Sequence, residues 1–152
     1  MTWDSDALRK PSHVSYINVG RHAFGQLSIT MTDDYKECLK IICDFPTIYK
    51  TGNKSPRDIL RQSGYFELFN DVTEKEIILH LTSNAGLIDT WLLFTEDIRH
   101  HPAWGLLSIG KLKWTVFFMD TKGKTEFTFD NPNEACAKMI KMTMEEIRKN
   151  NQ

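Results

Sequence analysis

The spacing of apolar and polar residues changes along the chain and divides it into a helical part and a sheet part. Between residues 33 and 83, apolar positions recur every three or four residues, which is typical of amphipathic helices. From residue 104 to residue 129, apolar and polar positions alternate, which is typical of half-buried strands. We therefore predict an α+β fold in which helices come first and an antiparallel sheet follows.

Each predicted helix of the first part has its own start signal. Asp33 and Asp34 favour the positive end of a helix dipole, and Ser55 followed by Pro56 is a typical helix start. Thr73 and Glu76 have the spacing of a capping box, and Gly86 is suited to end the helix that begins there. The apolar face predicted for the first helix comprises Tyr35, Cys38, Leu39, Ile42 and Phe45.

The second part predicts an antiparallel meander of three or four strands at about residues 91–129. Residues 91–96 are its first strand, and Asp120–Gly123 is a tight turn between the last two. Asn131 caps a final helix, which we expect to cover one face of the sheet. The face that it buries comprises Cys136, Met139, Ile140, Thr143 and Ile147.

Length and composition predict a single domain spanning residues 1–152. Residues 1–12 are polar and are expected to be loosely held, while weaker alternation at 14–19 and 26–31 predicts a hairpin. The first residues lack the pattern of a signal peptide, and no apolar run approaches the roughly 20 residues of a membrane helix. We expect a cytoplasmic protein whose three cysteines, which have no CxxC spacing, are buried free thiols.

Charge is unevenly distributed. The formal net charge of the chain is −1, but residues 71–100 hold six acidic and two basic residues, a net charge of −4. The chain has no Lys/Arg-rich tract that could neutralise a phosphate backbone, which disfavours direct nucleic-acid binding. An acidic surface that meets a basic protein partner is the more natural use of this segment.

A dense polar corner, residues 96–101, follows the apolar run at Trp91. Glu96 and Asp97 would face opposite sides of a strand, so an ion pair to Arg99 is a better use for them than catalysis. His100 and His101 are adjacent and belong to no metal-ligand motif, so no metal is predicted. Three tryptophans are expected to anchor the core: Trp91, Trp104 and Trp114. Trp104 directly follows the polar corner, so it can stand partly exposed and serve as a binding hot spot.

No motif for covalent catalysis, phosphate binding or dinucleotide binding occurs in the sequence. Cys136 lies in the middle of an apolar helix face, which is a poor position for a nucleophile. The residues therefore favour a protein that is not an enzyme and that needs no cofactor.

The segment from Trp91 to Trp104 has the spacing W-x-x-F-x-E-D-x-R-x-x-x-A-W and follows a helix and a Leu87-Ile88 step. This arrangement resembles one found in small bacterial immunity proteins of contact-dependent growth inhibition and polymorphic toxin systems. The later strands and the Glu134-Ala135-Cys136 helix start are also similar, so that the resemblance covers about residues 73–149.

The resemblance implies a cytoplasmic protein that binds one cognate toxin domain, with no membrane or nucleic acid as a direct partner. Such toxins are often nucleases, whose basic active sites an acidic protein could cover. The candidate contacts are four carboxylates and two possible anchors: Glu74, Glu76, Glu96, Asp97, Arg99 and Trp104.

Two alternatives remain open at the level of sequence. The chain could be a small hydrolase that uses the corner formed by Glu96, Asp97, Arg99, His100 and His101. It could also be an adaptor whose tryptophans line an apolar pocket for a small molecule.

Overall fold

The computed structural model describes residues 32–97, 103–110, 112–120 and 122–150. The chain divides into two units, Met1–Thr32 and Asp33–Gln152, and the second unit contains all the elements described below. The terminus 1–12 and the hairpin expected at 14–31 lie outside the described residues.

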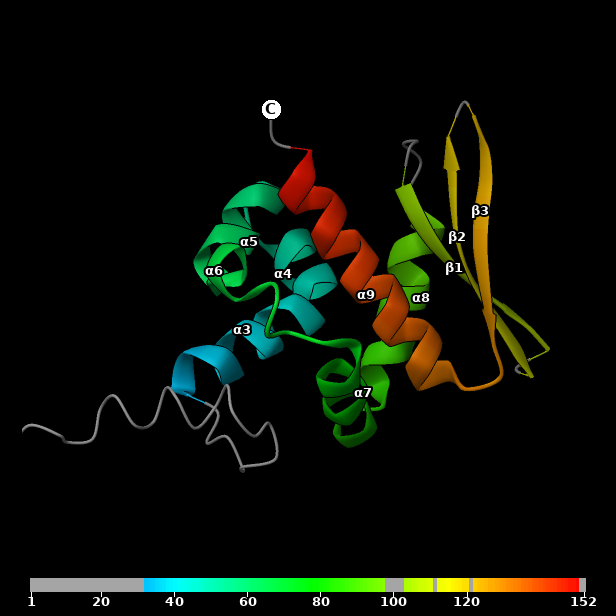
Figure 1. Ribbon diagram of the computed structural model, residues 1–152, viewed down its shortest axis with the longest axis horizontal. Coiled ribbons are helices and arrows are strands. Elements are labelled where there is room, and N and C mark those ends of the chain that lie inside the picture. The colour runs from blue at the N-terminus through cyan, green and yellow to red at the C-terminus, as the bar shows by residue number, and fades with distance from the viewer. Residues whose placement is uncertain (1–31, 98–102, 111, 121, 151–152) are drawn as a thin grey trace, which may run out of the picture. The chain divides into compact units, whose positions relative to one another are not determined.

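Within the described residues, seven helices and three strands follow one another (Figure 1). Their order is α3 (Asp33–Cys43), α4 (Phe45–Thr51), α5 (Pro56–Ser63), α6 (Tyr65–Leu68), α7 (Glu74–Ser83), α8 (Gly86–Asp97), β1 (Ala103–Ile109), β2 (Lys113–Asp120), β3 (Gly123–Phe129) and α9 (Pro132–Lys149). The prediction of an α+β fold, with helices first, an antiparallel sheet and a C-terminal helix, is confirmed.

The predicted helix starts are formed by side-chain caps. The Ser55 hydroxyl accepts a hydrogen bond from the Asp58 backbone N–H, and the Thr73 hydroxyl accepts one from the backbone N–H of Glu76. The Asn131 side chain accepts hydrogen bonds from two backbone N–H groups at the start of α9. These caps satisfy donors that a helix cannot satisfy itself, which is why the sequence locates the starts well.

The segment 91–96 is helical, so the prediction of a strand there was wrong. Ile88, Trp91 and Phe94 are the buried residues of α8 and recur every three positions, as one face of a helix requires. The run from Trp91 to Phe94 is apolar at every position, and such a run does not distinguish a strand from a helix. Gly86 begins α8 instead of ending α7 in a left-handed conformation, and the described sheet has three strands.

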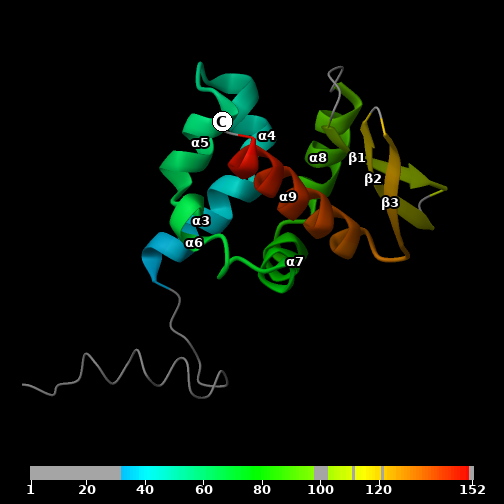
Figure 2. The same cartoon turned by 45° about the horizontal axis from the view of Figure 1, so that its top comes forward.

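The sheet has the order β1-β2-β3, with both neighbouring pairs antiparallel. Helix α9 packs against all three strands, as predicted, and α8 packs beside β1 (Figures 1 and 2). The Thr95 hydroxyl of α8 donates a hydrogen bond to the carbonyl of Leu106 on β1, 3.2 Å away. A β-carbon at Gly105 would clash with the ring of Phe117 on the paired strand, so glycine leaves room for that ring.

The cysteines are buried free thiols, as predicted. Burial raises the pKa of Cys38 to about 11 and that of Cys43 to about 12, so both stay protonated near neutral pH. In the part of the chain that the structure describes, no single helix is long and apolar enough to cross a membrane; α7 and α8 meet that test only together, and they are bent by 113°.

Candidate protein-interaction surface

The structure places the four predicted carboxylates in two pairs. Glu74 and Glu76 lie in the first turn of α7, and Glu96 and Asp97 lie at the end of α8. Because α7 and α8 are joined at a bend of 113°, the two pairs occupy the far ends of a bent helix pair. They do not form one cluster.

Lysines on other helices engage two of these carboxylates. Glu74 pairs with Lys138 of α9 at 3.2 Å, and Asp97 pairs with Lys50 of α4 at 3.4 Å. Glu96 is exposed. Both side chains of the Lys50–Asp97 pair are at least half exposed. Such exposed ion pairs contribute only about 0–1 kcal/mol to stability, so a cation of a binding partner can replace Lys50 at low cost. Arg99, expected to pair with Asp97 or Glu96, lies outside the described residues, as do His100 and His101.

Trp104 is a core residue, and the expectation that it stands partly exposed was wrong. Only 8% of it is exposed, and its ring packs against Phe118 and Phe127 with centroid distances of 5.0 and 6.2 Å. Trp91 and Trp114 are buried too, as predicted. Trp104 lies opposite Phe118 in the β1–β2 pairing, so the two rings stand on the same face of the sheet.

A different surface gathers exposed side chains around α8. The exposed residues Asp89, Leu93 and Glu96 recur at intervals of four and three, so they share one face of the helix with Asp97 beside them. The neighbouring helix α4 contributes Tyr49, which is 42% exposed and meets Phe94 of α8 edge-on at 6.2 Å. We call this surface the α4–α8 face, made of Tyr49, Asp89, Leu93, Glu96 and Asp97.

The end of α8 is electrostatically unfavourable for the helix. The C-terminal end of a helix carries partial negative charge, and carboxylates there cost a few tenths of a kcal/mol each. Glu96 and Asp97 occupy this end, and the last turn of α8, as the structure describes it, contains no basic residue. Glu96 and Asp97 thus break a local rule of helix stability, and such a break marks a candidate functional site. Reading 91–96 as a strand hid this feature, because a strand has no such dipole.

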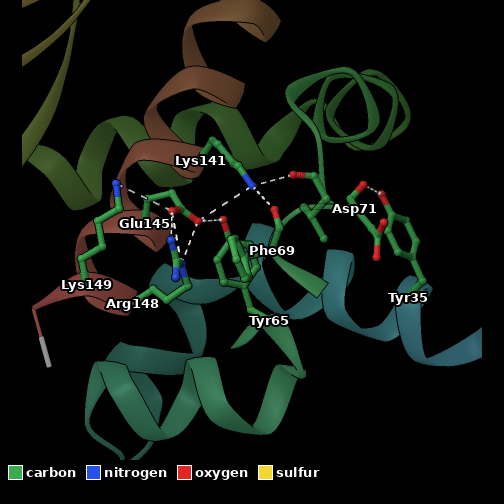
Figure 3. Close-up of polar contacts among 9 residues, drawn as sticks. Tyr35, Tyr65, Phe69, Asp71, Lys141, Glu145, Arg148 and Lys149 are labelled. Carbon is green, nitrogen blue, oxygen red and sulfur yellow. Dashed lines mark hydrogen bonds and ion pairs between the residues drawn. The ribbon is translucent and has the colours of Figure 1, made fainter. Parts of the chain in front are cut away.

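A second polar cluster joins α9 to the connection between α6 and α7 (Figure 3). The Lys141 ammonium donates hydrogen bonds to the backbone carbonyls of Phe69 and Val72, at 2.6 and 2.7 Å, and lies 4.0 Å from Glu145. The Tyr35 hydroxyl of α3 donates to the Asp71 carbonyl at 3.1 Å. Side chains thus satisfy three carbonyls of an irregular connection, which identifies the cluster as a structural clamp.

Glu145 is the centre of this clamp. It accepts hydrogen bonds from the Tyr65 hydroxyl at 2.8 Å and from the Arg148 guanidinium at 2.7 Å. Burial alone would raise the pKa of Glu145, but the hydrogen bonds from Arg148 and Tyr65, together with the charges of Arg148 and Lys141, outweigh burial and lower it. Burial lowers the pKa of Lys141, against the opposing effect of Glu145.

The lowered pKa of Glu145 predicts a loss of stability in acid. A carboxylate whose pKa is lower in the folded state stabilises the fold above its ordinary pKa of 4.5, and this stabilisation is lost as the pH falls through the folded value. The free energy of unfolding of the parent protein should therefore fall below about pH 4.5 more steeply than that of Glu145→Gln. Urea denaturation across this range checks the slope; equal slopes would contradict the assignment.

Of the corner that the hydrolase alternative would use, the structure describes only Glu96 and Asp97. Glu96 and Asp97 lie on an exposed helix end, and within the described ranges no three or more His, Cys, Asp or Glu residues gather as a metal site would need. A hollow of about 290 Å³ lies elsewhere, between the start of α5 and the end of α9, where Arg57 and Glu146 are among its lining residues. The three tryptophans fill the core.

Comparison with models of known protein families, with curated proteins and with solved structures gives no match to this chain.

Proposed function

We propose that this chain is an immunity protein, which binds a cognate toxin domain, covers the basic surface of its active site and has no catalytic activity of its own. The observation that carries the proposal is the pair Glu96 and Asp97, two carboxylates at the end of α8 where they do not help the helix. The net charge of −4 on residues 71–100 and the sequence resemblance over about residues 73–149 support it.

Inhibition would follow from complementary charge on a preformed surface. A nuclease domain concentrates Lys and Arg around the site that holds its phosphates, and such cations would pair with Glu96 and Asp97 in place of Lys50. Long-range attraction speeds the encounter of two such surfaces by about 10-fold to 1,000-fold at low salt. The toxin would then lose access to its nucleic acid because the same cations are occupied.

Glu74 and Glu76 remain candidate contacts at the far end of the helix pair. Helices of the lengths of α7 and α8 extend roughly 15 and 18 Å at 1.5 Å per residue. A standard interface covers about 800 Å² on each partner, which corresponds to a patch roughly 30 Å across. A single toxin domain is therefore large enough to reach both acidic ends.

Charge reversal at the end of α8 tests this proposal. We expect Glu96→Lys/Asp97→Lys to slow association with a toxin domain encoded beside this chain by about tenfold or more at low salt, and less at high salt. The free energy of unfolding should change by less than about 1 kcal/mol, because lysines suit the end of a helix whereas Asp97→Lys removes only an exposed ion pair with Lys50. Stopped-flow association and urea denaturation measure the two quantities.

A control with the same change in charge is Glu37→Lys/Glu67→Lys, at exposed positions of α3 and α6. These helices lie on the side of α9 away from the sheet (Figures 1 and 2). The control should slow association much less. An equal effect would mean that only net charge matters, and unfolding of the α8 variant would show that its carboxylates are structural.

A further inference from the structure

The α4–α8 face has an apolar centre as well as charge. Leu93 is 58% exposed in the middle of α8, with Asp89 one turn before it and Asp97 one turn after it. Tyr49 of α4 is 42% exposed, and the adjacent residue Lys50 pairs with Asp97. The exposed tyrosine of α4 and the exposed leucine and carboxylates of α8 therefore stand on two helices that are in contact.

Tyr49 is held in place by rings beneath it. Its ring stacks on Phe45 at 5.9 Å with an interplanar angle of 5°, and it meets Phe94 edge-on. Phe45 in turn stacks on the fully buried Trp91 at 6.2 Å. A ring supported in this way has already lost most of its conformational freedom, so it costs little entropy when a partner covers it.

The charge around this apolar centre defines the partner. Residues that contribute most to binding tend to be aromatic or apolar groups near the centre of an interface, surrounded by polar groups that exclude water. Here Asp89, Glu96 and Asp97 flank Leu93 on α8. They outnumber Lys50, which pairs with Asp97, so the face fits lysines and arginines. Other exposed apolar residues differ in setting: Ile109 of β1 pairs directly with Lys113 of β2, and Leu79 belongs to α7, which contributes no residue to this face.

We infer that Tyr49 and Leu93 are the apolar anchors of the interface, and that they take a protein partner with an apolar pocket bordered by Lys and Arg side chains. This inference rests on the proposed function and names the partner chemistry of its site. It assigns to Tyr49 and Leu93 the anchoring role that the sequence suggested for Trp104, which is buried.

A designed peptide tests the inference without the toxin. The probe is a 15-residue amphipathic helix of arginine and leucine, and its control is the same peptide with glutamine in place of arginine. In titrations of the ¹⁵N-labelled full chain, we expect the arginine peptide to shift amide signals at residues 47–51 and 89–97, and the glutamine peptide to leave them nearly unchanged.

Variants of two similarly exposed leucines complete the test. Leu93→Asp should weaken binding of the arginine peptide by about tenfold or more, whereas Leu79→Asp, at a site that is 56% exposed, should change it less than about twofold. If Leu93→Asp does not fold, Tyr49→Ala and Leu93→Ala replace it, and their peptide binding is compared with that of the Leu79 variant. Tyr49→Phe should bind as the parent does, because the ring makes the contact.

Three outcomes would overturn the inference: signal shifts centred on Leu107 and Ile109 of β1 and on Leu112 just before β2, equal binding of both peptides, or equal effects of the Leu79 and Leu93 variants. These are separate from failure of the proposed function. If the toxin domain does not bind the parent protein, the immunity proposal fails, whereas the peptide titration still decides whether this face takes a cationic, apolar partner.

Discussion

Trp91→Ala should lower the free energy of unfolding by about 3–5 kcal/mol, the largest effect that we expect from a single substitution. Trp91 is fully buried at the centre of α8, and its ring packs against Phe45 and Phe94. Its indole N–H also donates a hydrogen bond to the Cys43 carbonyl at 2.8 Å. The alanine variant would leave both a cavity and an unsatisfied carbonyl. Urea denaturation followed by far-UV circular dichroism measures the loss.

Trp91→Phe separates the two contributions. Phenylalanine keeps most of the packed ring but has no N–H, so we expect this variant to lose about 1–3 kcal/mol, less than the alanine variant. A loss below about 1 kcal/mol for Trp91→Ala would contradict the packing of α8 against α4, and with it the support beneath Tyr49.

Lys141→Met should lower the free energy of unfolding by about 2–4 kcal/mol, the second largest effect. Methionine keeps most of the aliphatic stem but removes the donors that the Phe69 and Val72 carbonyls accept. An unsatisfied buried polar group costs about 1–3 kcal/mol, and some of this cost is recovered where water reaches the connection. Amide hydrogen exchange should accelerate first at residues 69–73.

Lys149→Met is the matched control for this substitution. The Lys149 ammonium also lies 4.0 Å from Glu145, but its side chain is 65% exposed against 18% for Lys141. Removing its charge should therefore change stability by less than about 0.5 kcal/mol. If both variants lose the same stability, the clamp consists of charge alone and the carbonyl contacts of Lys141 contribute nothing.

Much of the fold could be predicted from the sequence because its signals are local. The helix starts at Ser55, Thr73 and Asn131 depend on residues within three positions of each cap, so the sequence contains the whole interaction. The turn from Asp120 to Gly123 is equally local, since the Asp120 side chain accepts hydrogen bonds from the backbone N–H groups of Lys122 and Gly123.

The candidate surface could not be predicted, because it depends on contacts between residues far apart in the sequence. The apolar run from Trp91 to Phe94 fits a strand or a helix equally well, and burial of Trp91 against Phe45 decides for the helix. That choice sets which way Leu93, Glu96 and Asp97 point, and it places Tyr49 beside them. The contacts of Lys141 with Phe69 and Val72 likewise span about 70 residues of sequence.

The most direct test of the proposed function is co-expression of this chain with candidate toxin domains from neighbouring genes, followed by purification and a measurement of cell survival. The proposal predicts a tight one-to-one complex that protects cells from the toxin, with protection weakened by Glu96→Lys/Asp97→Lys and retained by Glu37→Lys/Glu67→Lys. The contradicting result is that the folded chain forms no complex and gives no protection, while the purified protein turns over a substrate in a metal-dependent reaction.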